Sequence, residues 1–283
     1  MPTETLLTRT KRLLRTYGLR ARKGLGQHFL VDSNAVDTIL NTAQLTIEDT
    51  VVEVGPGLGV MTDELAKLAG KVIAVELDGQ LAGILKERFG GAKQVEIINQ
   101  DILKTDLAVL TGNRGTPAYK VVANLPYYIT SAVIRHFLEA TVKPSLLVLM
   151  TQKEVAQQIT APPGEMSLLS VSVQLYGAAK LVAIVPAGSF YPAPKVDSAI
   201  LSIDVYPAAR VGIDDIEGFF TLVKAGFSAN RKQIINPLSH QLAMERTDVL
   251  ALLAIAGIDY HRRAETLTIA EWKRLFEVYN AHP

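Results

Sequence analysis

The chain has 283 residues, of which 48% are hydrophobic and 20% are charged, as is typical of a folded globular protein. It contains no cysteine, which excludes disulfide bonds, thiolate chemistry and cysteine-ligated zinc, and its five histidines show no metal-ligand spacing. The N-terminus is polar and basic, and no later segment is apolar over a length that spans a bilayer. We therefore expect a cytoplasmic monomer with no metal and no membrane contact.

The formal net charge is only +1, but the charge is unevenly distributed along the chain. Seven lysines and arginines, and no acidic residue, lie between residues 9 and 23. A basic segment of this kind is typical of a surface that binds nucleic-acid phosphates. We predict a basic N-terminal arm over residues 1–25, with phosphate contacts from Arg12, Arg15, Arg22 and Lys23. The alternative is a solvated leader that only keeps the protein soluble.

From about residue 50, short β-branched runs alternate with helical stretches, which indicates an α/β fold with a mainly parallel sheet. Seven strands are predicted, at residues 51–54, 71–76, 95–99, 120–123, 145–151, 181–185 and 198–205. Helices are predicted between them at 62–68, 80–89, 131–140 and 153–160. The last two strands follow no obvious helix, so we expect one of them to run antiparallel.

Beyond about residue 208 the pattern is helical throughout. Helices are predicted at residues 216–228, 233–242, 248–256 and 270–278. The sequence therefore predicts a doubly wound catalytic domain over residues 26–208 and a small all-helical domain over residues 209–283.

After the first predicted strand the chain reads GPGLG, a glycine-rich turn that leads into a helix. Glycines there let the backbone approach a ligand at the carboxyl end of a parallel sheet, so Gly55 and Gly57 are predicted to contact it. The next strand ends at Glu76, about 20 residues after the first glycine, where dinucleotide folds place the carboxylate that binds ribose hydroxyls. One strand later, Asp101 and Ile102 are placed to meet an adenine amino group and ring. This adenosine pocket lacks a GxGxxG pyrophosphate loop, which favours S-adenosylmethionine over NAD; the alternative is that the two carboxylates are ordinary loop residues.

The fourth predicted strand ends in the turn Asn124-Leu125-Pro126-Tyr127. An exocyclic amine on an aromatic ring is a poor nucleophile, because its lone pair is delocalised. The Asn124 side-chain oxygen and the Leu125 carbonyl can accept its two N–H groups, aim the lone pair at a methyl sulfonium and stabilise the charge that grows on nitrogen. Tyr127 offers a stacking face. The turn thus predicts methyl transfer to an amino group of a base, although a strand-end turn with a buried tyrosine is the plain structural alternative.

A second unusual loop, FYPAPKVDS, begins at Phe190. Its aromatic pair is stiffened by two prolines. Enzymes that modify bases need the base out of its stack, so we predict that Phe190 covers the other face of a flipped base. The alternative is a core aromatic residue in a rigid connection.

At these residues the sequence resembles the KsgA family of ribosomal RNA small-subunit adenine N6,N6-dimethyltransferases. The resemblance covers most of the chain. It begins with GQHFL at residues 26–30, continues through the motifs above in family order, and ends with FSANRKQ at residues 227–233, where many members have arginine in place of Asn230.

The resemblance implies a class I methyltransferase fold that uses S-adenosylmethionine. It implies dimethylation of two adjacent adenines in a hairpin near the 3′ end of 16S rRNA, within the small ribosomal subunit or its precursor, in late ribosome assembly. It adds cofactor contacts by Gln27, His28, Leu30, Leu77 and Asn124, and RNA contacts by Lys195, Arg231 and Lys232.

Three other functions are compatible with parts of this pattern. A large-subunit rRNA adenine methyltransferase of the antibiotic-resistance type would share the fold and the chemistry, and only single residues in the Gly26 and Asn124 motifs favour the small-subunit type. A protein glutamine methyltransferase uses a similar turn, but the basic arm and the Phe190 loop argue against it. A non-catalytic RNA-binding factor on the same fold would not need an intact cofactor site.

Overall fold

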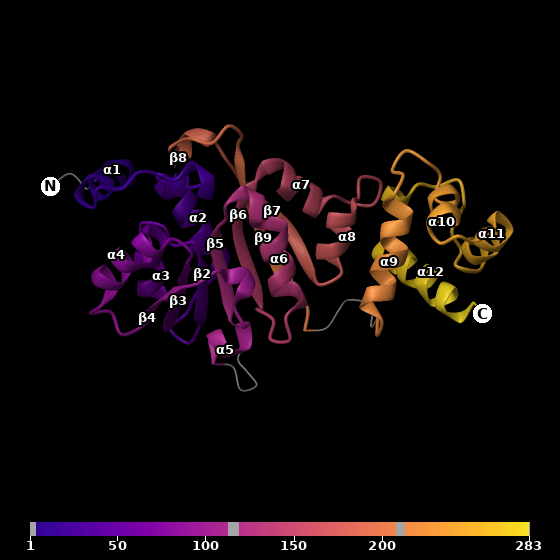
Figure 1. The fold of residues 1–283 in the computed structure, drawn as a ribbon, viewed down its shortest axis with the longest axis horizontal. Coiled ribbons are helices and arrows are strands. Elements are labelled where there is room, and N and C mark those ends of the chain that lie inside the picture. Colours follow the sequence, from indigo (N-terminus) through magenta and orange to yellow (C-terminus); the bar gives the residue numbers. More distant parts are fainter. Residues whose placement is uncertain (1–3, 113–118, 208–212, 283) are drawn as a thin grey trace. The chain divides into compact units, whose positions relative to one another are not determined.

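The computed structural model describes residues 4–112, 119–207 and 213–282 of the chain. It forms two compact units, the first from Met1–Ala156 and Ala178–Pro207 and the second from Gln157–Gly177 and Ala208–Pro283 (Figure 1). The predicted end of the catalytic domain at residue 208 lies outside the described residues. The structure groups Gln157–Gly177 with the C-terminal helices, whereas the sequence division placed this segment in the catalytic domain.

The first unit is built on a seven-stranded sheet with the order β4-β3-β2-β5-β6-β9-β7. Neighbouring strands from β4 to β6 are parallel, and β9 runs antiparallel to β6. The α/β fold class and the antiparallel strand near the end of the sheet are confirmed. The strands are β2 (Thr50–Val54), β3 (Lys71–Glu76), β4 (Val95–Asn99), β5 (Lys120–Asn124), β6 (Leu146–Gln152), β7 (Gly177–Val185) and β9 (Ser198–Val205).

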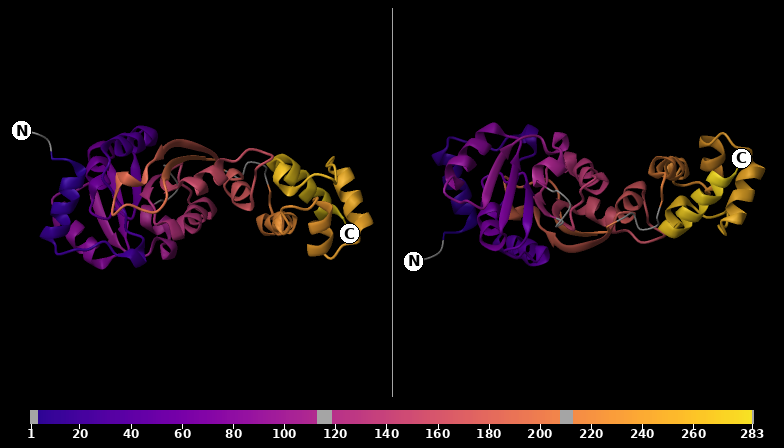
Figure 2. Two further views of the ribbon diagram at one scale, coloured as in Figure 1. Left: turned by 90° about the horizontal axis from the view of Figure 1, so that it is seen from above. Right: turned by 90° about the horizontal axis from the view of Figure 1, so that it is seen from below.

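Helices cover both faces of this sheet (Figure 2), so its central strands are buried on both sides and consist of apolar runs. Val51, Val52, Val72 and Ile73 are each 0% exposed. The helices are α2 (Ser33–Ala43), α3 (Val60–Leu68), α4 (Gly79–Phe89), α5 (Leu107–Thr111), α6 (Thr130–Glu139) and α7 (Lys153–Thr160), with short 3-10 turns at Lys23–Leu25, Ile102–Lys104, Tyr127–Ile129 and Ala187–Ser189.

The predicted N-terminal arm contains a helix that packs on the first unit. Helix α1 (Leu6–Thr16) begins at Thr5, whose side chain accepts a hydrogen bond from the Thr8 N–H. Leu13 and Leu14 are buried in a cluster with Phe29, Leu58 and Leu81. After α1 the chain forms the short strand β1 (Phe29–Leu30), which pairs antiparallel with β8 (Phe190–Tyr191). The segment is therefore a docked helix and a strand, and the sequence analysis predicted neither of these elements nor α2.

The second unit is helical, as predicted for the C-terminal region. Its helices are α8 (Leu168–Gln174), α9 (Ile216–Phe227), α10 (Ile235–Gln241), α11 (Arg246–Ile255) and α12 (Ile269–Ala281), with a 3-10 turn at Ala264–Thr266. Trp272 and Phe219 are both 0% exposed at its centre.

None of the helices in the described ranges has the length and apolar character that a membrane span requires. Within the same ranges, no group of three or more His, Asp or Glu side chains could hold a metal ion.

Candidate active site

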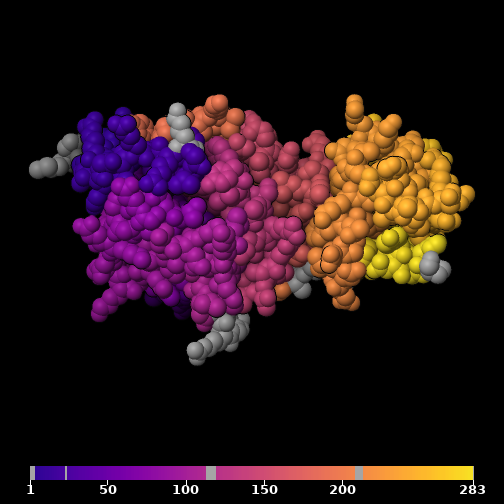
Figure 3. Space-filling view, in the orientation of Figure 1, coloured from indigo at the N-terminus to yellow at the C-terminus, as the bar shows by residue number. Residues whose placement is uncertain are grey.

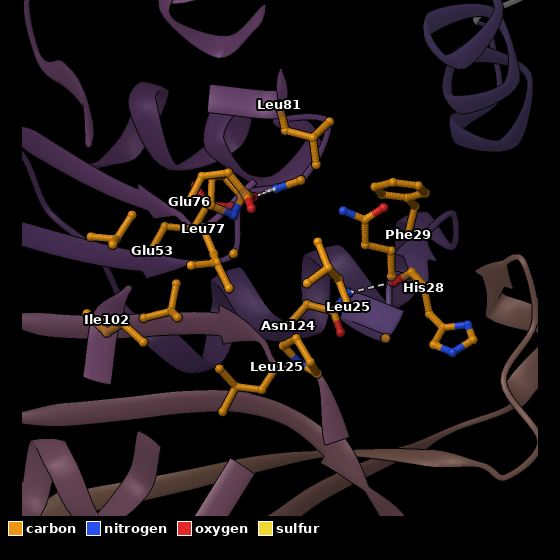
Figure 4. Close-up of a pocket in the computed structure, with 18 of the residues that line it drawn as sticks. Leu25, His28, Phe29, Glu53, Glu76, Leu77, Leu81, Ile102, Asn124 and Leu125 are labelled. Carbon is orange, nitrogen blue, oxygen red and sulfur yellow. Dashed lines mark hydrogen bonds between the residues drawn. The ribbon is translucent and has the colours of Figure 1, made fainter. Parts of the chain in front are cut away.

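A pocket opens in the first unit where β2, β3 and β5 end, which is where open α/β sheets bind their ligands (Figure 4). Every residue predicted to contact the cofactor lines this pocket, and so do the predicted catalytic residues Leu125 and Tyr127. The predicted cofactor residues are Gln27, His28, Leu30, Gly55, Gly57, Glu76, Leu77, Asp101, Ile102 and Asn124. The structure thus brings together motifs that are 100 residues apart in the chain, while their individual roles stay predictions.

Glu76 ends β3 and is held by the backbone on both carboxylate oxygens. Its Oε2 accepts the Gly57 N–H at 3.0 Å and its Oε1 accepts the Asp78 N–H at 2.9 Å. Burial raises the pKa of Glu76, against these hydrogen bonds, which lower it. Each carboxylate oxygen can accept a second hydrogen bond, so Glu76 can still bind a diol.

Gly57 has a positive φ of 58°, and a Cβ there would lie 3.2 Å from the Phe29 ring. Only glycine therefore allows both the turn and the close approach of Phe29.

Two apolar side chains and one carboxylate complete this side of the pocket. Asp101 follows β4, and its Oδ1 accepts the Leu103 N–H at 3.0 Å, which fixes the short turn after it. Ile102 is 4% exposed, whereas Leu77 is 52% exposed. Figure 4 shows Glu76, Leu77 and Ile102 in the same part of the pocket. Aliphatic side chains beside a diol acceptor fit a nucleoside.

A third carboxyl group, Glu53 on β2, lies in the pocket wall and was not predicted as a site residue. It is 1% exposed and accepts a hydrogen bond of 2.6 Å from the Thr62 hydroxyl on α3. Burial raises its pKa to about 8, so Glu53 is mostly protonated at neutral pH. The signal in the sequence was a single acidic residue inside the apolar run VVEV.

The Asn124 side chain at the end of β5 has a defined orientation. Its Nδ2 donates to the His28 carbonyl at 3.0 Å (Figure 4). Because a carbonyl can only accept, the amide nitrogen must point at His28, and the Oδ1 faces the other way. The next residue, Leu125, is 2% exposed and donates its N–H to the Met150 carbonyl of β6 at 3.2 Å. Both residues are therefore anchored before any ligand binds.

Tyr127 is positioned by its ring and by its hydroxyl. The ring stacks on His28 with centroids 6.1 Å apart and planes 18° apart, and the hydroxyl lies 2.7 Å from the Ser198 hydroxyl. Burial raises the pKa of Tyr127. The neighbouring Tyr128 also lines the pocket and is 63% exposed, so it offers a second aromatic face that the sequence analysis did not single out.

Phe190 does not line the pocket in this structure. It lies in β8 opposite Leu30, is 4% exposed and packs in the core with Val36 and Val185. The buried ring presents no face to a base, because the pairing of β1 with β8 holds it in the core. Stacking by Phe190 would require this two-stranded ribbon to move, and it stays a prediction.

The cations predicted to bind RNA lie in both units. In the first unit, Arg12 pairs with Glu4 at 3.0 Å and Arg22 pairs with the buried Asp78 at 3.2 Å. The Asp78 carboxylate also accepts from Gln27 at 3.2 Å, which ties the N-terminal segment to the pocket wall. The side chain of Lys23 lies outside the described part of the chain. The remaining predicted cations are exposed, namely Arg15 and Lys195 in the first unit and Arg231 and Lys232 in the second.

The pocket fits S-adenosylmethionine by the chemistry of its residues. Glu76 has free acceptor capacity for a diol, the aliphatic Leu77 and Ile102 line the same pocket, and the glycine turn at residues 55–59 lacks the GxGxxG spacing of a pyrophosphate loop. Gly55, with a φ of 70°, keeps the first turn open next to the Asn124 carbonyl, which would lie 3.8 Å from an added Cβ.

Comparisons with known proteins agree with this site. The family described as ribosomal RNA adenine dimethylase matches residues 18–281. The chain is 51% identical to "Ribosomal RNA small subunit methyltransferase A" of Dehalococcoides mccartyi strain 195, over 99% of this chain and 96% of the relative. It is 40% identical to the protein of the same name from Clostridioides difficile strain 630, over 96% of this chain and 95% of the relative.

Two solved structures share the fold over most of their length. A dimethyladenosine transferase from Plasmodium falciparum superposes with a TM-score of 0.75 and 26% identity, covering 90% of this chain and 98% of the other. The 23S rRNA methyltransferase ErmE superposes with a TM-score of 0.70 and 30% identity, covering 89% and 99%. The match of the family to almost the whole chain and the full-length identity to its curated relatives lead to one conclusion: the chain belongs to the ribosomal RNA adenine dimethylase family.

Proposed function

We propose that the protein dimethylates the N6 amino groups of two adjacent adenines in a hairpin near the 3′ end of 16S rRNA, within the small ribosomal subunit or its precursor. The observation that carries this proposal is the fixed orientation of the Asn124 amide. Its nitrogen donates to the His28 carbonyl, so its oxygen stays available as an acceptor, and Asn124 lines the pocket that fits the methyl donor. The relatives named for the small subunit are up to 51% identical to this chain, against 30% for the 23S enzyme, which favours the small-subunit substrate. We expect a cytoplasmic monomer.

S-adenosylmethionine is the methyl donor and supplies an electrophilic methyl group on a sulfonium. The chain's part is to position the amine. Asn124 Oδ1 and the Leu125 carbonyl accept its N–H groups, which reduces the delocalisation of the nitrogen lone pair into the ring and directs this lone pair at the donor. The same two oxygens stabilise the positive charge that develops on nitrogen.

The second methyl transfer relies on fewer hydrogen bonds to the amine than the first. After one methylation the nitrogen loses a proton to the solvent and keeps a single N–H, so only one of the two acceptors can hold it by a hydrogen bond. The aromatic faces of Tyr127 and Tyr128 then contribute more of the positioning by stacking.

Lysine and arginine side chains are expected to hold the RNA outside the pocket through its phosphates. We assign this role to Arg12, Arg15, Arg22, Lys23 and Lys195 on the first unit, and to Arg231 and Lys232 on the second.

The test is single-turnover transfer of labelled methyl groups to small subunits that lack the modification. Asn124→Ala should lower kcat by roughly 10²–10³, with much less effect on KM, because it removes a contact made as charge develops. Calorimetry should show that cofactor affinity falls far less than kcat, because Asn124 is only one of the ten residues predicted to contact the cofactor. If Asn124→Ala transferred methyl groups at the wild-type rate, the amine-holding mechanism would be wrong. If the wild-type protein methylated large subunits instead of small ones, the proposed substrate would be wrong.

A further inference from the structure

A second concave site, which we call the basic groove, lies on the first unit between the N-terminal segment and the residues that follow β8. It is lined by Lys11, Leu14, Arg15, Gly18, Leu19, Arg20, Ala21, Tyr191 and Pro192. In Figure 3 the N-terminal segment (indigo) and the segment around residue 190 (orange) both reach the surface at the upper edge of this unit. The groove thus joins two segments that are about 170 residues apart in sequence.

The local structure of α1 gathers three cations at this groove. Lys11 and Arg15 are four residues apart and so lie on one face of the helix. Gly18, with a φ of 61°, then reverses the chain, and the Leu19 N–H donates back to the Leu14 carbonyl at 2.8 Å. This turn returns Arg20 to the groove. An added Cβ on Gly18 would meet nothing within 4 Å, so glycine is needed here for the turn and not for space.

The N-terminal cations whose side chains the structure describes fall into two groups. Arg9, Arg12 and Arg22 each pair with a carboxylate, on Asp63, Glu4 and Asp78 respectively. By contrast, Lys11, Arg15 and Arg20 pair with no carboxylate among the residues that the structure describes. Three like charges that converge without counter-charges repel one another, and a bound polyanion removes this repulsion.

An aromatic ring adjoins these charges. Tyr191 is 37% exposed, and the Lys11 ammonium lies 5.2 Å from the centroid of its ring. Proteins that bind single-stranded nucleic acids combine cations with exposed aromatic rings, because bases stack on the ring while phosphates contact the cation. An acidic protein partner would need the charges but not the ring.

The groove also lies beside the active site. The Pro192 carbonyl accepts a hydrogen bond from His28 Nδ1 at 2.7 Å, which requires the hydrogen to be on Nδ1. His28 lines the active-site pocket and stacks on Tyr127. His28 therefore lines the active-site pocket and also contacts Pro192, which lines the groove.

We infer that the basic groove binds the RNA strand next to the flipped adenine. Lys11, Arg15 and Arg20 contact its phosphates, and a neighbouring base stacks on Tyr191. This inference rests on the proposed function, because it takes the ligand to be the strand that delivers the target base. It adds the unpaired Lys11 and Arg20 to the cations already assigned to RNA, of which Arg15 also lines the groove.

The experiment measures binding of the full-length protein to unmethylated small subunits over a series of salt concentrations. Lys11, Arg15 and Arg20 are replaced together by Gln. Each phosphate contact on a single strand contributes roughly 0.7 to the slope of log K against log salt, so the triple variant should lower this slope by about 2. The matched control replaces the exposed Lys86, Lys93 and Lys104, also in the first unit, by Gln, which removes the same net charge.

Tyr191 is tested separately from the charges. Tyr191→Ala should weaken binding by roughly 5- to 100-fold with an unchanged salt slope, and Tyr191→Phe should bind almost as the wild type does, because stacking requires only the ring. Cofactor affinity, measured by calorimetry, should be unchanged in all of these variants, which shows that they are folded.

An unchanged slope in the groove variant, or an equal fall in the control, would overturn the inference. Failure of the wild type to methylate small subunits would count against the proposed function instead. In that case the salt slopes of the groove variant and the control would be compared on whichever rRNA the protein binds. This comparison would still decide whether the groove binds RNA.

Discussion

Glu76 is held by backbone N–H groups and still has acceptor positions free. The Gly57 and Asp78 N–H groups occupy one acceptor position on each carboxylate oxygen and leave the others open. We predict that Glu76→Ala weakens S-adenosylmethionine binding by about 1.5–3 kcal/mol, the scale of hydrogen bonds to a charged group. Glu76→Gln keeps one acceptor and should lose less. Calorimetric titration of the folded variants checks this, and unchanged affinity in Glu76→Ala would remove Glu76 from the cofactor site.

Stacking and hydrogen bonding by Tyr127 can be tested separately, because its ring packs on His28 while its hydroxyl is hydrogen-bonded to the Ser198 hydroxyl. We expect Tyr127→Ala to cost about 1–3 kcal/mol of base stacking, and Tyr127→Phe to retain most activity. Ser198→Ala removes the same hydrogen bond from the other side and should match Tyr127→Phe. Single-turnover methyl transfer at saturating cofactor measures all three. If Tyr127→Phe were as inactive as Tyr127→Ala, the hydroxyl would have a role beyond positioning.

The site could be predicted from sequence where a motif ends a strand. Glu76 and Asn124 are the last residues of their strands, whereas the glycine turn and Asp101 come just after theirs. Parallel strands end at one edge of the sheet. Glu53 and Tyr128 were missed, because the burial of a carboxyl and the exposure of an aromatic ring depend on packing between distant segments. For the same reason, the burial of Phe190 in β8 could not be read from its loop.

Helix α9 illustrates how packing can reverse a local preference. Glycine inside a helix is normally less favourable than alanine by about 1 kcal/mol. A Cβ on Gly226 would lie 2.4 Å from the Trp272 ring, whereas a Cβ on Gly83 in α4 would meet nothing within 4 Å. We predict that Gly226→Ala destabilises the protein by about 1–3 kcal/mol through overpacking, and that Gly83→Ala stabilises it by up to about 1 kcal/mol.

Thermal unfolding followed by circular dichroism measures both glycine variants. Trp272 is the only tryptophan in the chain, so its fluorescence also reports directly on the packing next to Gly226. Changes of the same sign in the two variants would mean that helix propensity, and not contact with Trp272, decides the outcome.

Elements with a clear hydrophobic period were predicted, whereas helices α1, α2, α5 and α8 were not. The strands β2 to β6 are short β-branched runs, and the helices α3, α4 and α6 between them lie close to their predicted positions. Helix α1 was not predicted, because its segment is dominated by basic residues. Its buried residues Leu13 and Leu14 pack on Phe29. Helix α8 contains the strand-like run VSVQ and is started by a capping box between Ser167 and Ser170.

At the scale of the whole molecule, the chain leaves the first unit and returns to it before the C-terminal helices begin. The segment Gln157–Gly177 belongs to the second unit, although residues on both sides of it belong to the first. The Glu265 carbonyl accepts the Gly164 and Met166 N–H groups at 2.8 and 3.3 Å, and Met166 is 4% exposed. A cut near residue 208 therefore does not separate the two units cleanly.

We predict that a fragment ending at Pro207 exposes the 157–177 segment, because its partners lie beyond the cut. The fragment should bind a hydrophobic dye more strongly than the full chain and unfold at a lower temperature. The Gly164 and Met166 amides should exchange hydrogen much faster, while the amides of β2 and β3, whose partners all lie in the first unit, should exchange at unchanged rates. Because the residues that line the cofactor pocket also lie in the first unit, the fragment should keep S-adenosylmethionine binding. Equal exchange at Gly164 and Met166 in fragment and full chain would show instead that residues 157–177 are stabilised by the catalytic unit, as the sequence division assumed.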